Sequence, residues 1–387
     1  MNQKLQGILI RRRRQELGWS QTNLCAGICA VSHLSKIEQG KSEGSSEVVE
    51  MLLARLGISW HQDPAFCRET GDWLEGWYER LFTGEDISAM VPELEARRED
   101  LRSSFFFLDW LLFSWVIADS PPEEPEEFVP AMDDRQHNLY LCLTEQFQEL
   151  LRTTDQSYFL LKAGVQLYCC GKYANAVSCL QRGVDRACQE GSLPVQLECR
   201  ICLGNCYSAL KQPDQIQEHF TAAIRMARSL GRQDDVQVIS YNLAIAEMNN
   251  GQTELALRHL QENPWNEGMY YHKLAICCER LGRKEEALAA LDKAADAPLE
   301  ELPGDPEAVR EVFGQMCRLV RFRLDDPNYL KNRDYGNLLI SCVHRLGELF
   351  HMNFVRAHAA YLEEWYVANR QYQKAYDVMR TIFLNGK

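Results

Sequence analysis

The sequence has no long apolar run and no recognisable secretion segment. In its 387 residues the longest candidate for a membrane span, Phe105 to Ala118, is fourteen residues long and contains Asp109. A bilayer-spanning helix needs about 20 apolar residues, so this segment predicts a buried helix. The arginines at positions 11 to 14 are not followed by an apolar run with a small-residue cleavage site. We therefore expect a soluble cytoplasmic protein that contacts no membrane.

Motifs typical of catalysis are also missing. The sequence contains no glycine-rich phosphate loop, no His-Glu-x-x-His pattern and no nucleophile elbow, and its nine histidines are scattered. His351 and His358 lie seven residues apart with Glu363 nearby, a spacing more typical of helix packing than of metal ligation. The sequence therefore predicts a protein that is not an enzyme and that holds no metal or cofactor.

Cysteine is frequent, but the pattern does not predict disulfides. The count of fifteen is odd, and in a long chain without a secretion segment thiols are best interpreted as small buried hydrophobic groups. Cys199, Cys202 and Cys206 share one face of a helix, yet no histidine or fourth cysteine completes a zinc spacing. We expect these three to pack in the core.

Net charge is distributed unevenly along the chain. The whole sequence carries −13, whereas residues 1–60 hold eight basic and five acidic residues, a charge of +3. The remainder, with 34 basic and 50 acidic residues, carries −16. A basic head on an acidic body is typical of a DNA-binding module joined to a domain that does not bind DNA.

The periodicity of the sequence predicts an all-α fold. Apolar residues recur at helical spacing between short Gly, Pro, Asp or Asn breaks, and no sustained period-two alternation occurs. The Pro-Glu stretch from Ser120 to Pro130 predicts a surface connection, and a composition break at Ser59 to Pro64 predicts the end of a first domain. We expect domains at residues 1–62, 63–155 and 156–387.

An internal repeat begins near residue 157. Small residues recur at one repeat position, at intervals of 40, 40 and 31 residues: Gly164, Gly204, Ala244 and Ala275. Large residues follow sixteen positions later, among them Leu180, Phe220, Leu260 and Leu291. This pattern resembles the tetratricopeptide repeat, in which antiparallel helix pairs stack into a right-handed superhelix with a concave inner surface. Segments 67–118, 133–152 and 306–351 fit weakly and are expected to be degenerate repeats.

The first sixty residues predict a helix-turn-helix. Leu5 to Leu17 has a helical apolar face, Ser20 is placed to cap a short second helix, and a third helix is expected from about Val31 to Gln39. Gly27 permits the turn between the last two helices, and Gly40 ends the third one. Two short helices joined by such a turn place the last helix in the major groove of DNA.

The run from Gly27 to Lys41, GICAVSHLSKIEQGK, resembles the head of the Rgg and PlcR class of peptide-sensing regulators, within the Cro/repressor helix-turn-helix group. The pairing of this head with tetratricopeptide repeats extends the resemblance over nearly the whole chain. The resemblance implies a homodimer, an inverted-repeat operator in double-stranded DNA, and a short signalling peptide that is re-imported and bound in the repeat groove, as in quorum sensing.

The resemblance also implies roles for residues of the head. Arg14 and Glu38 match a pair that forms an internal salt bridge between the first and third helices. Gln21 matches a phosphate contact at a helix N-terminus. The remaining residues expected to contact bases or phosphates lie on the exposed side of the third helix or in the basic segments: Ser32, His33, Ser35, Lys36, Lys41, Arg11 and Arg13.

For the repeats, the positions that usually line the concave face predict a peptide site. Asparagine can satisfy a peptide N–H and C=O together, and a lysine or arginine can hold a peptide carboxylate. The predicted peptide contacts are Lys162, Asn205, Tyr241, Asn242, Asn249, His272, Lys273 and Arg280.

The sequence is also compatible with two other functions. The chain could be a repeat-based interaction module that sequesters a partner regulatory protein, with DNA binding secondary. It could also be a peptide-independent dimeric repressor that uses its repeats only for dimerisation.

Overall fold

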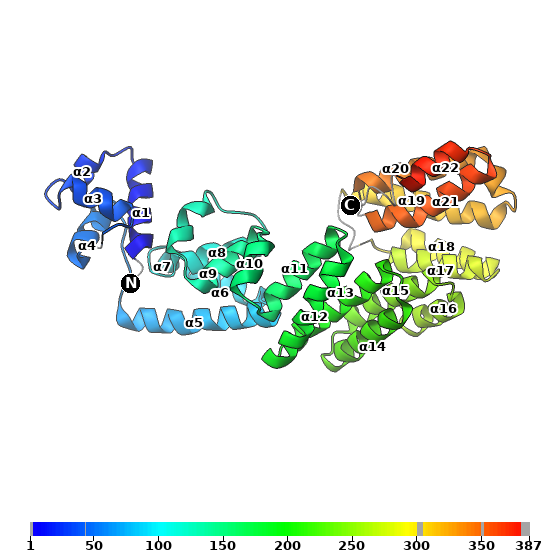
Figure 1. Ribbon diagram of the computed structural model, residues 1–387, viewed down its shortest axis with the longest axis horizontal. Coiled ribbons are helices and arrows are strands. Elements are labelled where there is room, and N and C mark those ends of the chain that lie inside the picture. The colour runs from blue at the N-terminus through cyan, green and yellow to red at the C-terminus, as the bar shows by residue number, and fades with distance from the viewer. Residues whose placement is uncertain (1–2, 43, 300–304, 350–351, 381–387) are drawn as a thin grey trace. The chain divides into compact units, whose positions relative to one another are not determined.

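The structure is a computed structural model that describes residues 3–42, 44–299, 305–349 and 352–380. Within these ranges the regular elements are α-helices and three short 3₁₀ helices, and the only β-type pairing is an isolated bridge between His61 and Ser104 (Figure 1). The all-α fold predicted from the periodicity is confirmed. No helix in the described part of the chain combines the length and the apolar character of a bilayer-spanning segment.

The chain divides into two compact units. Unit 1 comprises residues 1–163 and 182–196, and unit 2 comprises residues 164–181 and 197–387. The division between the two units runs through three helices: α11 (Ser157–Cys169), α12 (Tyr173–Glu190) and α13 (Leu193–Ala209).

The head of unit 1 consists of α1 (Gln3–Glu16), α2 (Gln21–Cys25), α3 (Val31–Glu38) and α4 (Ser46–Arg55). The side chain of Ser20 accepts a hydrogen bond from the Asn23 amide and so caps α2, as the sequence predicted. A shared core of buried residues joins the four helices: Ile10, Leu24, Leu34, Ile37, Val49, Leu52 and Leu53. Leu17, expected on the apolar face of the first helix, is exposed because α1 ends at Glu16.

The rest of unit 1 begins with the long helix α5 (Pro64–Thr83), which Asp63 caps and Gly84 ends. Short helices follow: η1 (Ser88–Met90), α6 (Val91–Ala96), α7 (Arg98–Arg102), α8 (Phe107–Ala118), η2 (Pro125–Ala131), α9 (Asp134–Leu143) and α10 (Phe147–Thr153). Aromatic residues dominate their core, with Trp77, Tyr78 and Phe113 almost completely buried. The Phe105–Ala118 segment thus forms a buried helix, as expected.

The stretch from Ser120 to Pro130 differs from the expected surface connection. Its 3₁₀ helix η2 packs on α1, and Phe128 is fully buried in a cluster with Leu5, Ile8 and Leu108. The first helix therefore has two apolar faces, one toward the head and one toward α8 and η2.

Unit 2 continues with successive helices. After α13 these helices are α14 (Pro213–Ser229), α15 (Gln233–Asn249), α16 (Thr253–Glu262), α17 (Gly268–Arg280), α18 (Lys284–Asp296), α19 (Pro306–Asp325), η3 (Tyr329–Lys331), α20 (Arg333–Leu349), α21 (Met352–Ala368) and α22 (Tyr372–Met379). Figure 1 shows α15 to α18 as successive antiparallel hairpins.

The small residues of the repeat lie where paired helices touch. A Cβ atom on Gly164 would lie 2.5 Å from Leu180 Cγ, and one on Gly204 would lie 2.5 Å from Phe220 Cε1. These distances are shorter than van der Waals contact, so a side chain at Gly164 or Gly204 would force the facing Leu180 or Phe220 to move. The repeat spacing seen in the sequence thus has a direct steric cause.

Candidate DNA-binding and peptide-binding sites

Helix α3 turns a polar side toward solvent. Leu34 and Ile37 are buried in the head core, whereas Ser32 and Lys36 are exposed and His33 and Ser35 are half-buried. Ser35 also accepts a hydrogen bond from the Gln39 amide at 3.2 Å. Because a helix of this kind contacts bases through its exposed side, Ser32 and Lys36 are the residues of α3 most available to DNA.

A buried network joins the three helices of the motif. Arg14 Nε donates to Glu38 Oε1 at 2.6 Å, Arg14 Nη2 donates to Glu38 Oε2 at 2.9 Å, and Gln21 Nε2 donates to the same Oε2 at 2.7 Å. Arg14 Nη1 also donates to the carbonyl of Trp19 at 2.8 Å. Glu38 is only 3% exposed, and the hydrogen bond with Glu38 raises the pKa of Arg14. Gln21 was expected to contact a phosphate. In the free chain its side-chain amide is instead hydrogen-bonded to Glu38.

Arg55 is a residue of the head that the sequence did not indicate. Its Nη1 donates to the carbonyl of Leu24 at 2.8 Å and to that of Ala26 at 2.5 Å. These carbonyls end α2 and begin the turn to α3, where Gly27 has a φ of +73°. Arg55 therefore fixes α4 to the turn that orients α3.

The basic residues of α1 have partners inside unit 1. Arg11 forms an ion pair with Glu127 of η2, and Arg12 lies 3.6 Å from a carboxylate oxygen of Glu123. Arg13 pairs with Glu16 on its own helix at 3.0 Å. Of the basic residues proposed for phosphate contact, Lys36 and Lys41 are exposed and form no ion pair among the described residues.

The asparagines expected at the peptide site lie on two helices of unit 2, α13 and α15. Asn205 is on α13 and half-buried, Asn242 is on α15 and half-buried, and Asn249 ends α15 and is exposed. Their side-chain amides form no hydrogen bond with the described residues. Amide donors and acceptors in this state are available to a peptide backbone.

His272 departs from its expected place on an exposed inner face. It is only 1% exposed and packs between Phe313 of α19 and His358 of α21, with ring centroids at 5.9 and 6.4 Å. Residues of α19 and α21 cover this position of α17, so a position that lines the surface in an open repeat array is part of the core. Tyr241 is also largely covered, and its ring lies 5.9 Å from that of Trp265.

The three cations proposed for a carboxylate differ in their surroundings. Lys162, in unit 1, is exposed and lies 5.4 Å from the ring of Tyr158. In unit 2, Lys273 is half-buried, and burial together with the nearby Arg280 lowers its pKa to about 8. Arg280 Nη1 donates to the carbonyl of Met248 at 2.9 Å, which ties α17 to α15.

The cysteines are not uniformly buried as expected: Cys169, Cys170 and Cys188 are exposed, whereas the cluster on α13 lies in or beside the core. Cys199 and Cys206 are buried, and burial raises the pKa of Cys206 to about 12 and that of Cys199 further. Thiols in such surroundings stay protonated and are poor nucleophiles or metal ligands. Among the described residues no group of three or more His, Cys, Asp or Glu side chains is arranged to hold a metal ion.

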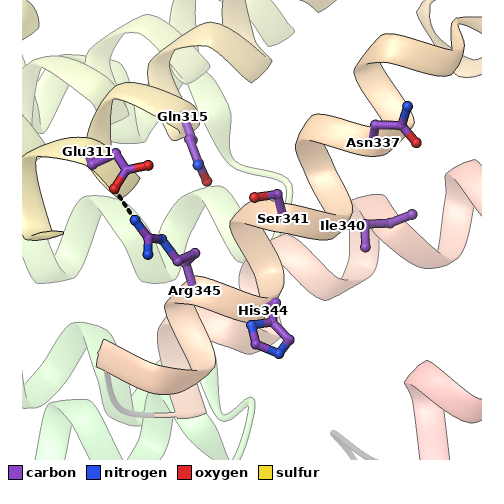
Figure 2. Close-up of a pocket in the computed structure, with 7 residues that line it drawn as sticks. All are labelled: Glu311, Gln315, Asn337, Ile340, Ser341, His344 and Arg345. Atoms are coloured by element: carbon purple, nitrogen blue, oxygen red, sulfur yellow. Dashed lines mark hydrogen bonds and ion pairs between the residues drawn. The ribbon is translucent and has the colours of Figure 1, made fainter.

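A pocket outside the predicted peptide contacts lies between α19 and α20. Figure 2 shows Glu311 and Arg345 closing one end as an ion pair, with Gln315 and Ser341 beside them. Its other lining residues are Asn337, Ile340 and His344. None of the residues that the sequence predicted for peptide binding lines this pocket.

The comparison with protein families identifies the same two kinds of region, the head and the repeats. A helix-turn-helix family model matches residues 10–61, and a tetratricopeptide repeat model matches residues 270–298, which form α17 and α18. The chain joins a helix-turn-helix domain to tetratricopeptide repeats. No curated protein matches the sequence of this helix-turn-helix and repeat protein.

Solved structures similar to this helix-turn-helix and repeat protein include a Rap protein complexed with competence and sporulation factor, with a TM-score of 0.57 at 14% identity over 82% of this chain and 97% of that one. They also include the Rap conjugation gene regulator of plasmid pLS20 in complex with the Phr* peptide (TM-score 0.48, 13% identity, 98% of this chain and 96% of that one). A third is Bacillus thuringiensis PlcR in complex with the peptide PapR7 and DNA (TM-score 0.33, 15% identity, 76% of this chain and 93% of that one). The likeness to the first is one of fold. Together with the two domain matches, it confirms the architecture that the resemblance implied.

Proposed function

We propose that this protein is a DNA-binding transcription regulator whose head binds an operator and whose repeats bind a short signalling peptide that controls it. The observation that carries the proposal is the head itself: an exposed polar side of α3 is oriented by the buried Arg14–Glu38–Gln21 network. A helix held in this way can enter the major groove without rearrangement of the head. The charge of +3 on residues 1–60 favours the approach of DNA.

In this proposal Ser32, His33, Ser35 and Lys36 face the bases or groove phosphates, and Gln21, Lys41, Arg11 and Arg13 contact the backbone. Arg11 would first have to leave Glu127. The peptide would lie on the inner helices of the repeats, where Asn205, Asn242 and Asn249 offer unengaged amides. We further propose that the protein acts in the cytoplasm as a homodimer on an inverted-repeat operator, and that it is not an enzyme.

Fluorescence anisotropy with labelled DNA from the protein's own promoter region tests the proposal. We expect the affinity for DNA to fall steeply as the salt concentration rises. Lys36→Ala should lower the affinity further, and a short peptide from a flanking reading frame should change it. Lys284→Ala, which removes a lysine of the repeats paired with Asp325, is the matched control and should leave binding unchanged. Absence of binding at low salt would overturn the DNA-binding part.

A second candidate is a repeat-based module that sequesters a partner regulatory protein. The fold likeness over 82% of this chain to a Rap protein complexed with competence and sporulation factor favours a protein-interaction function. Capture of a response regulator by the purified protein, together with inertness toward promoter DNA, would favour this candidate.

A further inference from the structure

Two pairs of equivalent residues lie on the neighbouring helices α15 and α17 of unit 2. The repeat interval of 31 residues between Ala244 and Ala275 makes Lys273 the equivalent of Asn242, and Arg280 the equivalent of Asn249. The two helices pack against each other, and the hydrogen bond from Arg280 to the Met248 carbonyl ties their ends together. Within each helix the two positions are seven residues apart and share one face, so the four side chains form two adjacent rows.

The cations of this face have no anionic partner, unlike other cations of the same region. Arg323 forms a two-point pair with Glu279 at 2.5 and 2.8 Å, and Lys284 pairs with Asp325 at 3.0 Å. Lys273 and Arg280 form no ion pair with any described residue.

Two carboxylates near this face in sequence form ion pairs with other residues, although Glu247 Oε1 is buried without a hydrogen-bond partner among the described residues. Glu247 of α15 binds His259 at 2.9 Å, and Glu279 of α17 binds Arg323. Lys273 is therefore half-buried without an ion-pair partner in the part of the chain that the structure describes. A half-buried cation without a partner is costly, and an incoming anion would recover part of that cost.

The asparagines supply the other half of the arrangement. The side-chain amides of Asn242 and Asn249 form no hydrogen bond with the described residues, and each offers two N–H donors. Ammonium, guanidinium and amide N–H groups on adjacent rows are a donor set suited to carboxylate oxygens.

We propose that Asn242, Asn249, Lys273 and Arg280 form an anion subsite that binds a carboxylate of the signalling peptide, either an acidic side chain or the C-terminal group. This inference rests on the proposed peptide binding and specifies the ligand class. Peptides with a carboxylate at the matching place bind, and otherwise identical neutral or basic peptides are rejected. The rejection arises because a basic side chain would face two unpaired cations.

The test uses the full-length protein and a synthetic library of heptapeptides of mixed sequence with free C-termini. Bound peptides are recovered on the protein and identified by mass spectrometry. Each selected peptide is then resynthesised in two forms, one with a C-terminal amide and one with Asn or Gln in place of Asp or Glu. Dissociation constants are measured for the wild type, Lys273→Met, Arg280→Met and the control Lys284→Met.

We expect one of the two neutral forms to bind about tenfold to a hundredfold more weakly, and which one it is identifies the source of the carboxylate. Lys273→Met and Arg280→Met should weaken the charged peptide to a similar extent and leave the neutral form unaffected, while Lys284→Met changes neither. Without peptide, Lys273→Met should melt no lower than the wild type, because the lysine forms no ion pair with the described residues. Tight binding that is insensitive to peptide charge and to both substitutions would overturn the subsite but leave peptide binding intact. Failure of the wild type to retain any peptide would contradict the proposed function itself and the subsite with it.

Discussion

Arg14 and Glu38 form a two-point ion pair inside the head, with Nε to Oε1 at 2.6 Å and Nη2 to Oε2 at 2.9 Å. The pair connects α1 to α3 across 24 residues of sequence, and Gln21 and the Trp19 carbonyl complete it. Every residue proposed to contact DNA on α3 therefore depends on a buried carboxylate for its position.

Replacement of Arg14 by Met should loosen the head selectively. Glu38 would remain buried without its charged partner, at a cost of about 3–5 kcal/mol. Hydrogen exchange measured by mass spectrometry on the full chain should show faster exchange in residues 3–38 and unchanged exchange in α17 and α18. Arg13→Met, which removes only the exposed pair with Glu16, should leave both regions as in the wild type. Unchanged exchange in the head of Arg14→Met would show that the pair does not hold it.

Arg55→Ala should lower DNA affinity without a direct contact to DNA. The substitution leaves the carbonyls of Leu24 and Ala26 without a donor and frees the turn that orients α3. We expect at least a tenfold weaker dissociation constant with an unchanged slope of log affinity against log salt, because no phosphate contact is lost. A reduced slope would instead identify Arg55 as a phosphate contact.

Gly204→Ala should destabilise unit 2 through steric overlap. The new methyl group would lie 2.5 Å from Phe220 Cε1, and overpacking of this kind costs about 1–3 kcal/mol. Gly347→Ala in α20 is the matched control, since a Cβ there meets nothing within 4 Å. Thermal unfolding followed by circular dichroism should show a lower midpoint for Gly204→Ala and an equal or higher one for Gly347→Ala. Equal midpoints for the wild type and Gly204→Ala would contradict the packing account of the repeat.

Acidification should destabilise unit 2 at His272. Burial holds the pKa of His272 well below its usual value, and the positive groups that face it, Lys273, His358 and Arg323, act in the same direction. The unfolded chain therefore binds a proton at His272 that the folded chain does not, so the free energy of unfolding falls as the pH drops below about 6.5. The midpoint of urea unfolding measured between pH 7.5 and 5.5 should decrease. In His272→Gln that decrease should be smaller, and an equal pH dependence in both proteins would exclude His272 as its origin.

The sequence was sufficient for the parts of the fold that local patterns encode. The spacing of Gly164 from Leu180 and of Gly204 from Phe220 is local, and each pair meets within one helix hairpin. The cap at Ser20 and the turn at Gly27 are likewise set by adjacent residues.

Other features depend on contacts between distant segments, which no periodicity records. Arg11 meets Glu127 across 116 residues, and the burial of Phe128 on α1 converts an expected surface connection into part of the core. Arg55 contributed only to the charge of the head in the sequence, and its role comes from carbonyls 29 and 31 residues earlier. His272 fell on a face that is exposed in an open repeat array, whereas α19 and α21 cover it here.

The most direct test of the account is hydrogen exchange of the full-length protein with and without saturating promoter DNA at low salt. If the head binds DNA, DNA should slow hydrogen exchange in residues 21–41, where α2, the turn and α3 lie. Lys36→Ala should lose that protection at the same DNA concentration. DNA-induced protection confined to the repeats, or none anywhere in the chain, would contradict a DNA-binding head.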